Sequence, residues 1–267
     1  TGGDDVFSGY RRHQAMIFSS YLKHIPNSFL KLLASIIRNA PFSNMKVNRL
    51  RKLSRDWGGN NINQLMGYFN WLPSNNFVFD LLSHDVKLKV HSYDPYEYGK
   101  FLLTKKTNLS KIDQMLLLEQ NTVLVDHNLN YTDKLSMSEG VEARVPFLDI
   151  DLVKLAGKIP QQFKIRNQIP KYILKKVAEK YLPKEIIYRS KTGFGAPVNE
   201  LINNQFKSRI KKELNKEKIK SEGLFNQKKV EKLILASQNK KNNFNYTILS
   251  LLTMQSWLKQ FPWSFKK

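Results

Sequence analysis

One stretch of the chain sets three charged side chains among apolar ones, Val141-Glu142-Ala143-Arg144-Val145-Pro146-Phe147-Leu148-Asp149. The apolar residues favour burial, whereas Glu142, Arg144 and Asp149 tolerate burial only when they are paired. Pro146 has no backbone N–H, and its ring restricts the preceding residue to extended geometry. The stretch therefore predicts a rigid, partly buried loop that ends where a helix begins at Asp149. Glu142 and Arg144 are expected to form a structural ion-pair clamp near a functional site.

The beginning of the chain also combines flexible and charged residues, in the order Thr1-Gly2-Gly3-Asp4-Asp5-Val6-Phe7-Ser8-Gly9-Tyr10. Gly2 and Gly3 allow the backbone to come close to a ligand. Two interpretations of Asp4 and Asp5 remain open at this point. They could cap a helix, or they could hold Mg2+ on a polyphosphate.

Two lysines further along the chain are candidates for binding an anion. Lys171 lies in the first turn of a helix expected over residues 171–182, where a cation opposes the helix dipole and gains nothing from the helix. Lys191 lies in a glycine-containing loop over residues 189–197, and a flexible ammonium group is suited to a phosphate. For Lys191, an ordinary exposed lysine is the alternative.

The spacing of apolar residues predicts a mainly helical chain with at most one or two short strands. Helices are expected over residues 11–40, where Pro26 divides them in two, and over 110–118 and 149–159, with three more over 200–267. Between 124 and 137, Asp126, Asn130 and Asp133 recur near helical spacing. They form either a polar helix face or part of a site.

Composition narrows the class of protein. The 267 residues include no cysteine, which argues against a disulfide framework or a thiolate metal site. The formal net charge is +22, and residues 201–241 hold twelve Lys and Arg against four Glu. A solvated basic helical surface is the favoured reading, and a nucleic-acid-binding face is the alternative. No apolar run has the length of a membrane span and no signal pattern opens the chain, so a cytoplasmic protein is expected.

Four motifs in order resemble one family, the C-terminal synthetase domain of the glutamine-hydrolysing asparagine synthetases. The segment from Gly2 to Tyr10 is similar to the family's Gly-Gly-Asp-Glu-Leu-Phe-Gly-Gly-Tyr. The segment from Tyr131 to Asp149 resembles its Val-Asp-Arg-Ala-Ser-Met and Leu-Glu-Ala-Arg-Val-Pro-Phe-Leu-Asp motifs. The blocks that begin at Lys171 and Lys191 match its two basic blocks.

The resemblance implies a domain organisation. Residues 1–267 would form the C-terminal part of a synthetase domain, with a site-bearing part over 1–200 and a helical extension over 201–267. In the whole enzyme this part would wrap the α/β nucleotide-binding sheet of a PP-loop ATP pyrophosphatase, of the adenine nucleotide alpha hydrolase-like type. The Ser-Gly-Gly-x-Asp-Ser loop and the glutaminase domain are absent from the sequence. We therefore expect a piece of a longer protein that does not turn over ATP by itself.

The resemblance also implies an activity. ATP would adenylate a carboxylate, most simply that of aspartate, and ammonia derived from glutamine would convert it to an amide, with AMP and pyrophosphate as products. Mg2+ would be bound by Asp4 and Asp5, and ATP or pyrophosphate by Gly2, Gly3, Asp4, Lys171 and Lys191. Lys191, on its loop, would close over the site. Tyr10 and Asp133 lie near positions that handle the nucleophile's proton in relatives that form β-lactams, so they join Lys191 as catalytic candidates.

Alternatives remain open for the acceptor and for the partners. Thr1 stands where many relatives carry an acidic residue, so an amidotransferase acting on a sugar acid in surface polysaccharide synthesis is a second reading. A non-catalytic relative and a nucleic-acid-binding basic helical domain are further alternatives. Expected partners are small-molecule substrates and the N-terminal glutaminase domain of the same parent chain, and a homodimer is left open.

Overall fold

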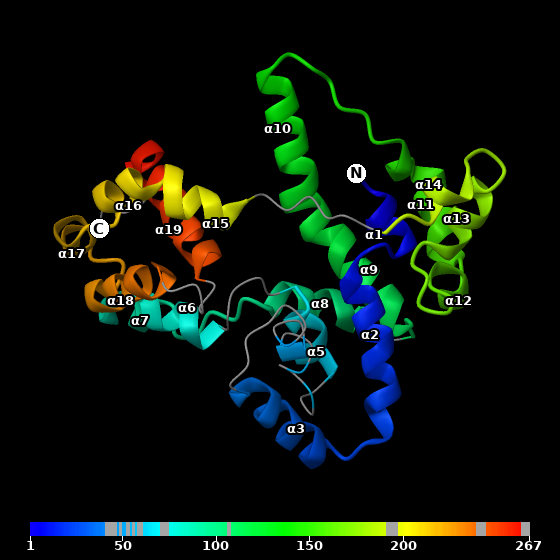
Figure 1. The fold of residues 1–267 in the computed structure, drawn as a ribbon, viewed down its shortest axis with the longest axis horizontal. Coiled ribbons are helices and arrows are strands. Elements are labelled where there is room, and N and C mark those ends of the chain that lie inside the picture. Colours follow the sequence, from blue (N-terminus) through cyan, green and yellow to red (C-terminus); the bar gives the residue numbers. More distant parts are fainter. Residues whose placement is uncertain are drawn as a thin grey trace. The chain divides into compact units, whose positions relative to one another are not determined.

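The computed structural model describes residues 1–40, 47, 50–51, 54, 57, 61–69, 75–105, 108–190, 197–238 and 244–262 (Figure 1). Helices predominate among these residues, and no β-sheet is present in the described part of the chain. The strand pairings there are isolated bridges, Leu82 with Phe225 and Arg166 with Ile169. The prediction of a mainly helical chain is confirmed.

The first half of the chain contributes these helices: α1 (Gly3–Phe7), α2 (Arg11–Tyr21), η1 (Leu22–His24), α3 (Asn27–Asn39), α5 (Asn61–Gly67), α6 (Asn75–Leu81), α7 (His84–Lys89), α8 (Glu97–Thr104), α9 (Lys111–Asn121), η2 (Val123–Leu129) and α10 (Asn130–Ser138). The second half contributes η3 (Pro146–Leu148), α11 (Ile150–Lys158), α12 (Gln161–Lys164), α13 (Tyr172–Ala178), α14 (Lys184–Ile187), α15 (Val198–Glu200), η4 (Leu201–Gln205), α16 (Lys207–Glu213), α17 (Lys216–Glu222), α18 (Gln227–Gln238) and α19 (Asn245–Gln260). None of the described helices is both long and apolar enough to cross a membrane.

The chain divides into two compact units, each made of two segments. Unit 1 comprises Thr1–Phe69 and Pro95–Lys191, and unit 2 comprises Asn70–Asp94 and Thr192–Lys267. Residues 75–94 thus pack with the C-terminal helices, which periodicity alone did not indicate. Their backbone is tied there, because the N–H of Asn226 donates to the carbonyl of Leu81 (2.8 Å) and that of Ser83 donates to the carbonyl of Leu224 (2.9 Å).

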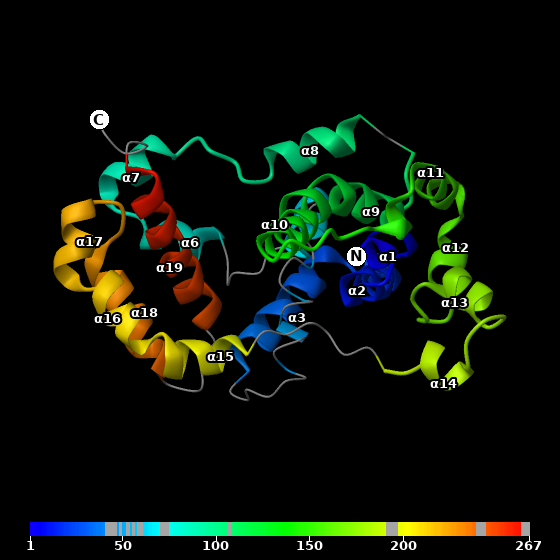
Figure 2. The ribbon, with the colours of Figure 1, turned by 90° about the horizontal axis from the view of Figure 1, so that it is seen from above.

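Helix α9 lies at the centre of unit 1, where α1, α2, α8 and η2 all contact it. Figure 2 shows α1, α2 and α9 together. Ser110 caps this helix, since the N–H of Asp113 donates to Ser110 Oγ (3.1 Å). Ile112 and Met115 are fully buried, and they anchor the helix by the burial of their apolar area. The division of residues 11–40 at Pro26 is also confirmed, because α3 begins directly after it.

The C-terminal region contains more helices than the three we expected. Four helices, α16 to α19, follow η4 in unit 2. Asn215 begins α17, because its side chain accepts from the N–H of Lys218 (2.8 Å), and Gly223 ends it in the left-handed conformation with φ 67°. These two local signals separate α17 from the helices on either side of it. The core shared by α16 to α19 includes Ile219, Val230 and Ile248.

The stretch over residues 141–149 has the predicted helix start but not the predicted burial. Asp149 Oδ1 accepts from the N–H groups of Asp151 and Leu152 (both 3.0 Å), so the predicted helix start is confirmed. The predicted burial is wrong, since Glu142 and Arg144 are 66% and 83% exposed. Gly140, at φ 69°, ends α10, and the following residues leave a helix that stands clear of its neighbours (Figure 1).

Candidate functional site

The glycine-rich beginning of the chain forms a short, tightly held helix, α1. Gly2 has φ 96°, and a Cβ there would lie 2.7 Å from Leu148 Cδ2, so only glycine fits both the conformation and the packing. The carbonyl of Gly2 accepts from the N–H of Val6 (2.9 Å), which starts the helix. The N-cap residue is Gly2, which has no side chain, so neither Asp4 nor Asp5 occupies the capping position. The capping interpretation of this pair is therefore not realised.

Asp4 lies on the open side of this turn beside Lys171. Its Oδ1 is 3.0 Å from Lys171 Nζ, and both side chains are partly exposed. Lys171 has φ 54°, a strained conformation for a lysine, immediately before α13. Two residues predicted separately to bind metal and pyrophosphate are thus adjacent in space.

Gly9 makes room for the Asp4 carboxylate. A Cβ at Gly9 would lie 1.7 Å from Asp4 Oδ1, well inside any allowed contact. The N–H of Gly9 donates to the carbonyl of Asp4 (2.9 Å), and Ser8 between them has φ 66°. The turn therefore folds back under the carboxylate and holds it against the backbone.

Asp5, the neighbouring carboxylate, is directed into the core of unit 1. It is 1% exposed, and Tyr10 Oη donates to its Oδ1 (3.1 Å). Burial, and then the nearby charge of Glu119, raise the pKa of Asp5, while the Tyr10 hydrogen bond opposes this rise. Burial and the charge of Asp5 likewise raise the pKa of Tyr10. The two adjacent aspartates thus occupy different environments, since Asp4 is partly exposed to solvent and Asp5 is buried.

A buried ion cluster centred on Glu119 lies beneath Tyr10. Glu119, in α9, is fully buried, and its Oε1 accepts from Arg12 Nε. His13 Nε2 lies 2.8 Å from Glu119 Oε2 and is equally buried. The Arg12 guanidinium also lies over the Tyr10 ring, 4.2 Å from its centroid. His13 is therefore a core residue.

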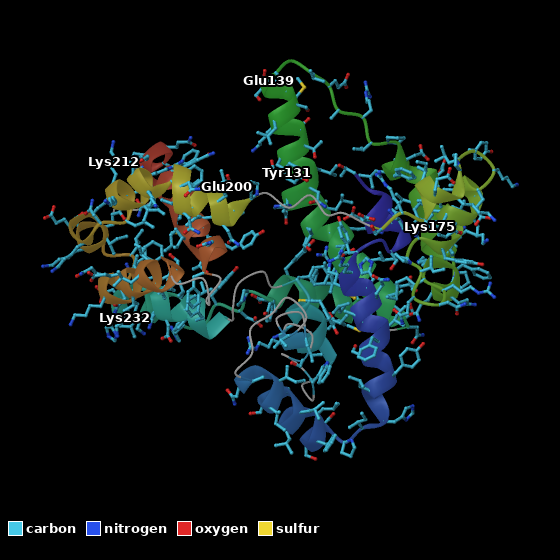
Figure 3. The ribbon with its side chains drawn as sticks, in the orientation of Figure 1. Tyr131, Glu139, Lys175, Glu200, Lys212 and Lys232 are labelled. Carbon is cyan, nitrogen blue, oxygen red and sulfur yellow. The ribbon has the colours of Figure 1, made fainter. Side chains whose placement is uncertain are left out.

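The helical run η2–α10 contributes the remaining predicted residue, Asp133. The run meets Tyr10 at its beginning, because Asn128 Nδ2 donates to Tyr10 Oη (3.1 Å). Asp133 lies further along on the exposed surface, where an open depression is lined by Val125, Asp126, Leu129, Asn130 and Asp133. Figure 3 shows Tyr131 on this helix and Glu139 at its end. Tyr10 is thus bonded to the start of the run that carries Asp133, but Tyr10 is partly buried and Asp133 is exposed.

The remaining predicted site residues are Lys191, the pair of Glu142 and Arg144, and Gly3. Lys191 lies outside the described residues. Arg144 pairs with Glu142 (2.8 Å), so the ion pair exists, but its exposure makes it a surface pair and not a buried clamp. A Cβ added at Gly3 would lie 3.5 Å from Phe147 Cδ2, an ordinary van der Waals distance, so packing does not require glycine at this position.

A divalent cation would find one suitable protein group on this face. The part of the chain that the structure describes holds no cluster of three or more His, Cys, Asp or Glu able to bind a metal. Mg2+, however, is commonly held by one or two carboxylates together with substrate phosphates. The partly exposed Asp4 fits that mode, and the buried Asp5 does not.

Sequence reasoning missed Arg12, Glu119 and Asn128. A signal for Glu119 was present, because it follows the apolar run Met115–Leu118 within one helix. A charged side chain on such a face requires a partner. The identity of the partners was not readable, since Arg12 is distant in sequence.

Comparison with known proteins shows the family of the chain. The family model described as asparagine synthase matches residues 1–259. The chain belongs to the asparagine synthase family. It is similar to asparagine synthetase [glutamine-hydrolyzing] 1 of Bacillus subtilis, with 26% identity over 208 residues, which cover 76% of this chain and 31% of that protein.

Two further relatives match shorter regions. Asparagine synthetase [glutamine-hydrolyzing] 3 of Bacillus subtilis is 31% identical over 133 residues, covering 47% of this chain and 22% of its own length. The nodule asparagine synthetase [glutamine-hydrolyzing] of Pisum sativum is 43% identical over 70 residues, which cover 23% of this chain and 12% of that protein. The chain thus spans less than a third of the length of these relatives. No solved structure matches it.

Proposed function

We propose that the intact protein is an ATP-dependent amide-forming ligase. It adenylates a carboxylate with release of pyrophosphate, and ammonia derived from glutamine then attacks the acyl carbon and displaces AMP. Aspartate is the favoured acceptor, because the relatives carry the name asparagine synthetase. A sugar acid is the second candidate.

The observation that carries the proposal is the ion pair between Asp4 and Lys171 (3.0 Å). A magnesium–pyrophosphate group presents both a cation and an anion. It would separate this pair, with the carboxylate turning to the cation and the ammonium to the phosphate oxygens. Two opposite charges on partly exposed side chains are suited to that exchange, because each meets an opposite charge of the ligand when the pair separates.

Asp4 is the residue that would hold Mg2+, and when bound the ion neutralises phosphate charge. Lys171, with Lys191 by its position in the sequence, would stabilise the negative charge that grows on the departing pyrophosphate. Gly2 and Gly3 keep the backbone of the turn free of side chains. We assign Asp5 to the support of α1, because its carboxylate is buried and bonded to Tyr10. Asp133, on the open face of α10, stays a candidate for handling the proton of ammonia.

The first test is exchange of labelled pyrophosphate into ATP by the intact protein with Mg2+ and aspartate. Asp4→Asn and Lys171→Met should each lower the exchange rate by about a hundredfold or more. Lys176→Met is the matched control, because Lys176 lies in α13, the helix that Lys171 precedes, but pairs with Glu179 (2.9 Å). Wild-type protein that shows no exchange with any carboxylate would refute the proposal, as would exchange that survives both substitutions.

The same assay identifies the acceptor and the ammonia source. Stimulation by aspartate alone would make the protein an asparagine-forming enzyme, and stimulation by a sugar uronate would move it to surface polysaccharide chemistry. Glutamine that replaces free ammonia in amide formation would support a glutaminase domain in the same parent chain. Residues 1–267 alone are expected to show no exchange, and an active fragment would contradict that part of the proposal.

The nucleic-acid alternative has less support. Several lysines of unit 2 are engaged with acidic side chains, Lys218 and Lys259 with Glu213, and Lys229 with Asp80. Paired lysines offer less charge to phosphates. Salt-sensitive binding of duplex DNA or RNA at physiological ionic strength would revive this alternative.

A further inference from the structure

We propose that Tyr10, Asp5 and Glu119 form a buried positioning network that fixes the Asp4 carboxylate, and that the Tyr10 hydroxyl acts there as a hydrogen-bonding bridge, not as a proton carrier. The inference rests on the proposed function, which gives Asp4 its role. It reassigns Tyr10, which the sequence placed among the catalytic candidates.

The hydroxyl of Tyr10 connects two elements. It donates to Asp5 Oδ1 (3.1 Å) and accepts from Asn128 Nδ2 (3.1 Å), so it links α1 to η2. Both directions of hydrogen bonding are used in these contacts. A phenol that has to accept or deliver a substrate's proton needs to face the substrate, whereas this one faces a side chain held in the core.

Asp5 transmits this link to Asp4. The side chain of Asp5 is held by Tyr10, and its carbonyl accepts from Gln120 Nε2 of α9 (3.1 Å). The backbone of the adjacent residue, Asp4, is held as a result, because it lies in the same helical turn, and its carboxylate rests on Gly9. The orientation of the open carboxylate is thus set by its buried neighbour.

Glu119 holds Tyr10 from below. It binds Arg12 and lies 2.8 Å from His13, and both belong to the first turn of α2, directly after Tyr10. The Arg12 guanidinium in turn covers the Tyr10 ring. Replacing Glu119 would leave Arg12 as an uncompensated buried cation, and the ring above it would lose its support.

The decisive variant is Tyr10→Phe, which keeps the ring and removes the bridge. Two reactions of the intact protein are compared, pyrophosphate exchange, which reports adenylation, and amide formation from added ammonia. A positioning role predicts that exchange falls by about tenfold to a hundredfold, with a raised apparent KM for Mg2+, and that amide formation falls in proportion. A proton carrier would instead leave exchange intact and abolish amide formation, which would overturn the proposal.

Glu119→Gln should reproduce the raised KM for Mg2+, since it acts through the same turn. Asp113→Asn is the matched control. Asp113 is also an acid of α9 with a buried cationic partner, Lys164 (2.6 Å), but it lies at the opposite end of the helix from Glu119. Equal losses of Mg2+ dependence in both variants would reduce the Glu119 cluster to a general stabilising role and contradict the inference.

A crystal structure of Tyr10→Phe provides a readout that does not depend on activity. The inference expects the Asp4 carboxylate to leave Lys171 Nζ while α2 and α9 keep their places. An unchanged Asp4–Lys171 pair would overturn the inference even if the wild-type protein proved inactive as a ligase. Wild-type exchange that is absent would refute the proposed function alone, so the two failures are distinguishable.

Discussion

Gly9 has no side chain at the point where the carboxylate of Asp4 needs the space. The contact is so close that a single methyl group would lie 1.7 Å from the carboxylate oxygen. At the scale of residues, the site thus depends on the lack of a side chain at Gly9 as much as on its charged groups. Conformational freedom is not the main reason for this glycine, since the close approach itself excludes any Cβ.

Gly9→Ala is therefore expected to displace the Asp4 carboxylate and lower pyrophosphate exchange by roughly a hundredfold. Gly157→Ala is the control, because a Cβ there has no neighbour within 4 Å and Gly157 lies inside α11. Alanine in a helix interior should preserve activity and raise the free energy of unfolding by about 0.5–1 kcal/mol. Full activity of Gly9→Ala would contradict the assigned geometry.

Glu213 supplies a residue-scale prediction for unit 2. The hydrogen bonds from Lys218, and then from Lys259, lower the pKa of Glu213 to about 2. A carboxyl group whose pKa is lowered in the folded state stabilises the fold at any pH above its unfolded-state pKa, near 4.5. This contribution is lost as the pH falls toward 2, the folded-state pKa.

We expect this contribution to be about 1–2 kcal/mol at neutral pH, less than the full shift because solvent screens the lysines. At pH 7, the free energy of unfolding measured with urea should be lower for Glu213→Gln than for the wild type. The difference between the two proteins should shrink steadily between pH 4.5 and pH 2. A difference that stays constant over this pH range would show that Glu213 is not charged through these contacts.

At the scale of elements, α11 illustrates how a motif can have a structural reason independent of any site. Asp149, the last residue of the quoted stretch, satisfies two N–H groups at the helix start. The helix then buries Ala156 beside Val6 and Phe7 of α1. The cap of α11 therefore supports the helix on which the candidate site is built.

Asp149→Ala should lower the free energy of unfolding by about 1 kcal/mol, because both capping hydrogen bonds are lost. Asp151→Ala is the comparison, since the Asp151 side chain is 93% exposed and makes only a long contact with Lys154. That substitution should change stability by less than about 0.5 kcal/mol. Thermal or urea unfolding measures both, and equal effects would argue against the cap.

At the scale of the whole molecule, the two units have separate cores. Unit 2 is built around Ile248, Leu252 and Ile219, whereas unit 1 is built around α9 with Met115 and Leu118. Each core joins segments that are distant in the sequence. Stability within each unit should therefore respond to substitutions in its own core.

Ile248→Ala should destabilise unit 2 by about 2–5 kcal/mol, because Ile248 is fully buried and the cavity cannot close completely. Amide hydrogen exchange in α16 to α19 reports this loss directly. Leu235→Ala on α18 is the control, since Leu235 is 59% exposed and its replacement should leave exchange nearly unchanged. Slow exchange retained in Ile248→Ala would contradict the assigned core.

Much of the local structure was predictable. The division of residues 11–40 at Pro26 and the starts of α9 and α11 depend on neighbouring residues, so proline and capping side chains indicated them directly. The predicted number of C-terminal helices was wrong because the spacing of apolar residues did not resolve the helix ends that Asn215 and Gly223 set for α17. The burial of Glu142 and Arg144 was wrong because apolar neighbours indicate a preference for burial, not what covers the loop.

By itself, the sequence determined the helical character of the chain, the glycine turn before Asp4 and Asp5, and the order of motifs that marks the family. These follow from interactions between residues that are close along the chain. Only the tertiary structure decided that Asp4 meets Lys171, that Asp5 turns inward to Tyr10, and that Glu119 of α9 pairs with Arg12. The reason is physical: identical neighbouring carboxylates become different groups when one is buried and the other is solvated, and burial is set by segments far away in sequence.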